Sequence, residues 1–84
     1  MSFATRLAAL PEGTFTGTAH GRRYVVTKSS FSGGKSVKLV AEELGGTDYI
    51  SLNWYELKTG GALRPCEMPE TKVRAFVDAL DVTA

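Results

Sequence analysis

The feature that most constrains the fold is a two-residue alternation of apolar and polar side chains in residues 48–57, DYISLNWYEL. Ile50, Leu52 and Trp54 fall on one side of this period, and the residues between them are polar or tyrosine. Successive side chains of a strand point to opposite faces of a sheet, so this stretch predicts a strand with one buried and one solvated face. We therefore expect the rest of the chain to pair with this strand and to cover its apolar side.

The sequence before this strand predicts further strands, at residues 14–20, 23–31 and 36–43. The last of these is ambiguous, because its apolar residues also fit the spacing of a helix that ends at Gly45. Register favours the strand. A four-residue loop before residues 48–57 aligns apolar pairs on one face, namely Val37 with Trp54, Leu39 with Leu52 and Ala41 with Ile50.

The two ends of the chain predict helices. Ser2 can cap a short helix that runs to about Leu10, and apolar residues at helical spacing predict an amphipathic helix from about Pro69. Residues 62–67 predict either a short edge strand near Leu63 or an extended lead into the second helix. The expected fold is α+β: a four-stranded antiparallel meander with a short N-terminal helix and an amphipathic C-terminal helix packed on one face.

Length and charge limit the possible functions. The 84 residues predict a single domain, 1–84, and a formal charge of +1 excludes a strongly basic nucleic-acid binder. The charge is uneven, because no Asp or Glu occurs from Gly13 to Ala41, whereas this stretch contains Arg22, Arg23, Lys28, Lys35 and Lys38. Part of the sheet is therefore expected to be locally positive.

The single cysteine cannot form an internal disulfide, and with one histidine the chain has too few soft ligands for a structural zinc site. No apolar run approaches the ~20 residues that span a bilayer, and the N-terminus does not read as a secretory signal. These patterns predict a cytoplasmic protein that uses no cofactor and no metal.

Two groups of residues have the composition of a phosphate-binding or catalytic site. Gly34-Lys35-Ser36 matches the end of a phosphate-binding loop, but Ser29 stands where that loop needs its first glycine, so a hairpin turn is favoured. Cys66 and His20 would form a nucleophilic pair only if the fold brought them together, and nothing in the sequence indicates this. We expect a binding module rather than an enzyme.

The outer face of the predicted sheet is the better candidate site. By alternation it carries tyrosines and cations from several strands, and tyrosine rings can stack on unpaired bases while Lys and Arg neutralise phosphates. This predicts single-stranded nucleic acid as partner, with candidate contacts Arg23, Lys28, Lys38, Tyr49, Asn53, Tyr55 and Arg64. The alternative is a protein-interaction or homodimerisation domain, because exposed aromatic residues also stabilise sheets and form interfaces.

Residues 37–80 also resemble a known family. The run Asp48-Tyr49-Ile50-Ser51-Leu52, then Tyr55, then Gly60-Gly61-Ala62-Leu63-Arg64-Pro65 and a closing helix is similar to the positive-cofactor-four family of transcriptional coactivators. The resemblance implies a curved antiparallel sheet followed by a helix, working as a homodimer that binds single-stranded DNA. The chain differs from that family at Cys66-Glu67-Met68-Pro69, where the family has a basic strand.

Homodimerisation is also predicted from the edge of the sheet. The strand at residues 14–20 has neither a charge nor a proline before His20, so its unpaired backbone groups invite a second copy to pair along it. The alternative is that the N-terminal helix or the segment near Leu63 covers this edge.

Overall fold

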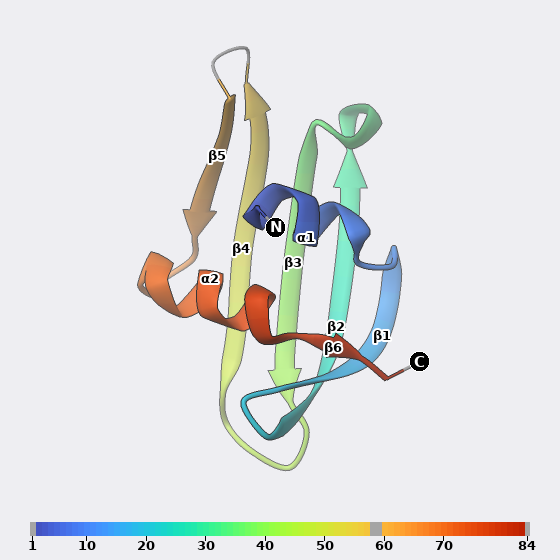
Figure 1. Cartoon of the computed structure of the whole chain (residues 1–84), viewed down its shortest axis with the longest axis vertical. Helices are drawn as coiled ribbons and strands as arrows, with labels where there is room; N and C mark the ends of the chain where they lie inside the picture. Colours follow the sequence, from blue (N-terminus) through green and yellow to red (C-terminus); the bar gives the residue numbers. More distant parts are fainter. Residues whose placement is uncertain (1, 58–59, 84) are drawn as a thin grey trace.

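The computed structural model describes residues 2–57 and 60–83. These residues form an antiparallel sheet, two α-helices and a short 3-10 turn. In chain order the elements are α1 (Phe3–Ala9), β1 (Gly13–Ala19), β2 (Arg22–Phe31), the 3-10 turn η1 (Ser32–Gly34), β3 (Ser36–Glu43), β4 (Tyr49–Leu57), β5 (Gly60–Pro65), α2 (Glu70–Ala79) and β6 (Asp81–Val82). The order across the sheet is β5-β4-β3-β2-β1-β6, so β1 to β5 form a meander and α2 carries the chain back to the opposite edge (Figure 1). The α+β class is therefore confirmed.

The predicted register of the central hairpin is confirmed. Residues 36–43 form a strand rather than a helix, and β3 meets β4 with Val37 opposite Trp54, Leu39 opposite Leu52 and Ala41 opposite Ile50. Between β1 and β2, Phe15 lies opposite Val26. A shift by one residue would turn every apolar side chain of a strand to the solvent, so burial selects this register.

The predicted number of strands is wrong, because the described residues form six strands rather than four. β5 occupies the predicted edge near Leu63, and Pro65 is its last residue, where a missing N–H is tolerated. The sequence did not predict β6, since two residues carry no periodicity. β6 pairs with β1 at Gly17 and Thr18, so the chain itself occupies part of the edge that was expected to receive a second copy.

The close approach of β6 to β1 depends on Gly17. A Cβ atom at this position would lie 2.8 Å from the carbonyl oxygen of Asp81 and 2.8 Å from Cδ1 of Leu80. Protein interiors have no room for such overlaps. Glycine at position 17 therefore allows the end of the chain to lie on the β1 edge.

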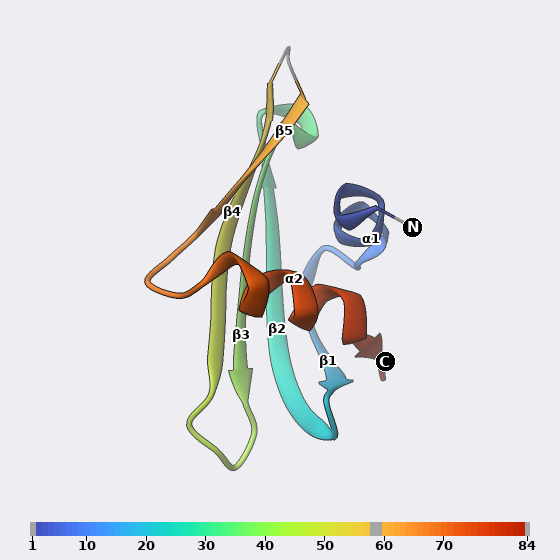
Figure 2. The same ribbon diagram turned by 60° about the vertical axis from the view of Figure 1, so that its left-hand side comes forward.

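The two described helices lie on the same side of the sheet, and the other side is uncovered (Figure 2). We call these sides the inner face and the outer face. α2 buries Val73, Phe76 and Val77, and the Phe76 ring meets the Tyr24 ring edge to face, with centroids 4.9 Å apart. Full burial of an apolar side chain of this kind contributes roughly 1.5–3 kcal/mol, so packing on the sheet stabilises α2 more than helix propensity does. The prediction that both helices pack on one face of the sheet is thus confirmed.

Lys28 of β2 caps the C-terminal end of α1. Its side chain points to the inner face, is 5% exposed, and donates from Nζ to the carbonyl oxygens of Leu7 (2.8 Å), Ala8 (3.2 Å) and Leu10 (2.8 Å). The last carbonyls of a helix lack intrahelical donors and carry partial negative charge, which suits an ammonium group with three donors. Burial lowers the pKa of Lys28, and the charge of Glu12 opposes this shift. Lys28 therefore ties α1 to the sheet.

Arg6 of α1 makes the same kind of contact with α2. Its Nη2 atom donates to the carbonyl oxygens of Val77 (3.2 Å), Asp78 (2.8 Å) and Leu80 (3.3 Å). The last turn of α2 has no basic residue of its own. A cation from α1 thus supplies the favourable interaction with the helix dipole that α2 lacks locally, and the sheet, α1 and α2 are linked in series.

We expect Lys28→Met to lower the free energy of unfolding by about 1–3 kcal/mol, because one buried and two partly buried carbonyls at the end of α1 lose their donor. Hydrogen exchange should show the loss of protection in α1 before the strands open. Lys38→Met is the matched control, since Lys38 is exposed on the outer face, and it should change stability by less than about 0.5 kcal/mol. Equal stability of the two variants would contradict the capping role.

Candidate functional site

The outer face is an uncovered surface of β1 to β5 whose side chains form rows across the strands. The pairings place Ser29 opposite Lys38, Lys38 opposite Asn53, and Asn53 opposite Arg64, so these residues of β2, β3, β4 and β5 form one row. Lys38 and Arg64 are exposed, and Asn53 between them is half-buried. The row therefore presents two cations on either side of an amide.

A second row lies next to the first, toward the end of the sheet that carries the 3-10 turn. Here Phe31 lies opposite Ser36, Ser36 opposite Tyr55, and Tyr55 opposite Ala62. Phe31 is 54% exposed and Tyr55 is 40% exposed. Because β3 separates their strands, the backbones at Phe31 and Tyr55 are about 9.5 Å apart, with a small serine between them. Ser36 therefore has a strand with an exposed aromatic residue on each side, at a backbone spacing of about 4.8 Å.

The structure separates two predicted contacts from this cluster. Tyr49 lies at the opposite end of the outer face, where it is paired with Glu42. Arg23 is also at that end, opposite Thr18 of β1. A carboxylate in this region repels phosphate, so Arg23 and Tyr49 lie in a less favourable setting than Lys38, Asn53, Tyr55 and Arg64.

Lys28 has to be removed from the predicted contacts. It lies in the acid-free stretch, but the alternation of β2 turns it to the inner face, where it is buried and hydrogen-bonded to α1. A lysine in this position cannot meet a ligand on the outer face.

Phe31 was missing from the predicted contacts, although the two-residue period already placed it on the outer face. Its importance comes from the pairing of Phe31 with Ser36 and of Ser36 with Tyr55, which puts two rings on either side of a small residue. This arrangement can be seen only when the β2–β3 register and the β3–β4 register are both known. The available signal was an aromatic residue at the end of a strand, directly before a glycine-containing turn.

Cys66 is not brought near His20. Cys66 follows β5 and His20 follows β1, and three strands lie between β5 and β1 in the sheet, which separates them by about 19 Å. The described contact of the thiol is a hydrogen bond that Asn53 donates from Nδ2 to Sγ, at 3.4 Å. Lys35 lies in a hairpin turn followed by β3, so the hairpin interpretation of Gly34-Lys35-Ser36 is confirmed.

A polar cluster holds α2 to the end of the sheet that carries the β3–β4 loop. Asp48 accepts a hydrogen bond from the Tyr24 hydroxyl on Oδ2 (2.8 Å) and from Lys72 Nζ on Oδ1 (2.7 Å). The hydrogen bonds from Lys72 and Tyr24 lower the pKa of Asp48. Burial, followed by the hydrogen bond to Asp48, raises the pKa of Tyr24, so its hydroxyl remains a donor. The cluster joins β2, the loop and α2.

The stabilisation by Asp48 should depend on pH. Its folded pKa is below the ordinary value of 3.8, so the contribution is fully present above that value and is lost as the pH falls through the folded pKa. We expect Asp48→Asn to lower the free energy of unfolding by about 1–2 kcal/mol at pH 7 and to flatten its decline in acid. Chemical denaturation from pH 7 to pH 2 measures both effects. An unchanged acid limb in the variant would show that Asp48 is not responsible.

Residues 2–57 and 60–83 contain no cluster of three or more His, Cys, Asp or Glu side chains that could hold a metal ion. In this described part of the chain, no helix has the length and apolar character needed to cross a membrane. Comparison with protein-family models, with curated proteins and with solved structures gives no match to the chain.

Proposed function

We propose that this protein is a non-enzymatic module that binds single-stranded nucleic acid on its outer face. The observation that carries the proposal is the adjacency of two rows, one with Lys38 and Arg64 and the other with Phe31 and Tyr55. Cations for the backbone and rings for the bases are the two components of single-strand recognition. The resemblance of residues 37–80 to the positive-cofactor-four family implies the same class of ligand.

An unpaired base supplies a flat ring that can lie over Ser36. Stacking between Phe31 and Tyr55 needs no particular base, because every base has a π-face. Asn53 is the neighbouring side chain with both a donor and an acceptor, although its Nδ2 already donates to Cys66. We therefore expect the protein to bind single-stranded nucleic acid with little sequence preference.

The rows lie about 6.8 Å apart, since they are two residues apart along each strand. A chain whose base lies over Ser36 thus has its phosphates within reach of Lys38 and Arg64. Lys35, in the turn before β3, adds a cation at the same end of the sheet. The single cysteine fits a reducing compartment, and we propose a cytoplasmic location.

A labelled oligothymidylate should bind the protein with an affinity that falls steeply with salt, as measured by fluorescence anisotropy. Lys38→Ala should reduce the slope of log K against log salt by about 0.7, the value expected for one lost phosphate contact. Tyr55→Ala should weaken binding by about 1–3 kcal/mol, and Tyr55→Phe should retain most of it because the ring remains.

Arg74→Ala is the charge-matched control. Arg74 lies on α2, where it pairs with Glu70, and so belongs to the covered side of the sheet. Its removal should leave the salt slope unchanged. Absence of binding to any oligonucleotide at low salt, or an equal loss from Arg74→Ala and Lys38→Ala, would reject the proposal.

The alternative function is homodimerisation, and the open edge formed by β5 favours it. β5 pairs with β4 on one side and ends the sheet on the other, whereas β6 occupies part of the β1 edge. Two copies that pair along β5 would continue the sheet across a two-fold axis. Sedimentation at ~100 μM should show a dimer if this is correct, because a micromolar dimer would be formed at that concentration. A monomer that binds oligonucleotide would remove the alternative.

A further inference from the structure

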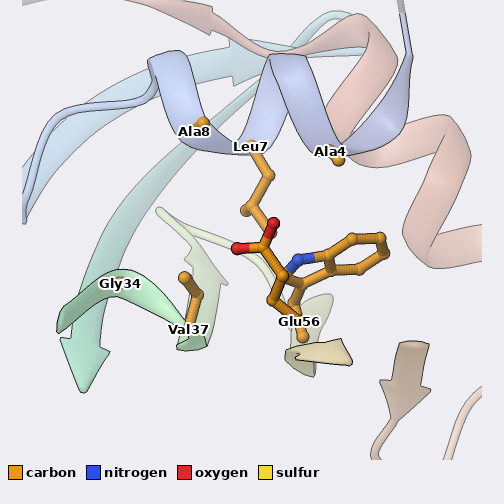
Figure 3. Close-up of a pocket in the computed structure, with 7 residues that line it drawn as sticks. Ala4, Leu7, Ala8, Gly34, Val37 and Glu56 are labelled. Atoms are coloured by element: carbon orange, nitrogen blue, oxygen red, sulfur yellow. The ribbon is translucent and has the colours of Figure 1, made fainter. Parts of the chain in front are cut away.

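A cavity of about 160 Å³ lies on the inner face between α1 and the ends of β3 and β4 (Figure 3). It is on the opposite side of the sheet from the proposed nucleic-acid site. The residues around it are Ala4, Leu7, Ala8, Gly34, Val37, Trp54 and Glu56. Apart from the Glu56 carboxylate and the indole N–H of Trp54, their side chains are apolar or absent.

The cavity exists because small residues face the sheet at this point. Ala4 and Ala8 are one helical turn apart, so they lie on the same side of α1, and Gly34 closes one end without a side chain. Leu7 is buried next to them and Val37 rises from β3. Because both alanines line the cavity, a larger side chain at position 4 or 8 is expected to occupy part of the space.

Trp54 lines one side of the cavity, and neighbouring residues fix the position of its ring. Its ring packs against Phe3 with centroids 5.6 Å apart. On β5, a Cβ atom at position 61 would lie 1.8 Å from a carbon of the Trp54 ring, so the indole rests directly on the backbone of Gly61. With contacts on both sides, the ring needs no rearrangement to receive a ligand.

Glu56 gives the cavity its charge. It lies two residues after Trp54 on β4, so both side chains belong to the inner face, and Figure 3 shows its carboxylate directed toward the space below α1. None of the ion pairs among the described residues uses Glu56. The cavity therefore combines an apolar lining with one carboxylate.

We propose that this cavity binds a small organic amine, with its ammonium group on Glu56 and a compact apolar body against Leu7, Val37 and Trp54. The pocket opens to solvent beside Ala8, Gly34 and Glu56, which are exposed, and its volume is close to the roughly 150 Å³ of an enclosed cavity that holds benzene. An ammonium group matches the carboxylate, whereas a carboxylic acid or phosphate would be repelled by it. This inference does not depend on the nucleic-acid proposal, because it concerns the other face.

Benzylamine is the probe, and the fluorescence of Trp54, the single tryptophan of the chain, is the readout. Titration at neutral pH should give a saturable change with a dissociation constant on the order of 1–10 mM, as expected for a ligand of this size. Benzyl alcohol, which has the same shape without the charge, should bind about three- to fivefold more weakly. Phenylacetate should not bind.

Two variants separate the parts of the site. Glu56→Gln should weaken benzylamine about three- to fivefold and make it equal to benzyl alcohol. Ala8→Leu should abolish binding, because its side chain takes up space that the ligand's ring needs. Both positions are exposed, so the variants should fold, and circular dichroism verifies this. The proposal is overturned if the wild type shows no saturation by ~100 mM, a concentration well above the expected constant, or if either variant binds benzylamine like the wild type.

Discussion

The structure depends on two buried or partly buried cations that satisfy the carbonyl ends of helices. Lys28 reaches from β2 to the end of α1, and Arg6 reaches from α1 to the end of α2. Short helices are unstable alone, and the partial negative charge at their C-termini needs a donor. Because each cation comes from a different element, the contacts that complete the helices also fix their position on the sheet. Packing of Phe76 on Tyr24 then completes the layer.

The two faces of the sheet differ in how far contacts within the chain occupy their polar groups. The inner face holds the core, the caps and the Asp48 cluster, so Lys28, Tyr24 and Asp48 are occupied by contacts within the chain, whereas Glu56 makes none of the ion pairs among the described residues. On the outer face, by contrast, Lys38, Phe31 and Tyr55 are exposed to solvent. Lys28 and Lys38 illustrate this difference. Both lie in the acid-free stretch, yet Lys28 is buried at the end of α1 and Lys38 is exposed on the outer face.

The candidate site was predictable in part. Alternation correctly put Lys38, Asn53 and Tyr55 on one face, and the structure brings them together with Arg64, which lies on β5. Alternation assigns a residue to a face but does not say how far along that face it lies. That position depends on the register between neighbouring strands. Arg23 and Tyr49 are therefore on the outer face but at its other end, beside Glu42. Lys28 was predicted as an outer-face contact from its charge, although the alternation of β2 places it on the inner face.

The sequence by itself determined the strands β1 to β4, the register between β3 and β4, and the two helices, because local periodicity and the burial of apolar pairs specify these features. Only the tertiary structure decided the rest. β6 forms because Gly17 leaves room for the chain end, Trp54 packs on the backbone of β5 because Gly61 has no side chain, and Lys28 is buried because α1 ends next to it. The contacts of Gly17 with the chain end and of Lys28 with α1 join residues distant in sequence, and the contact of Trp54 with Gly61 depends on the register of the β4–β5 hairpin, so no local pattern records them.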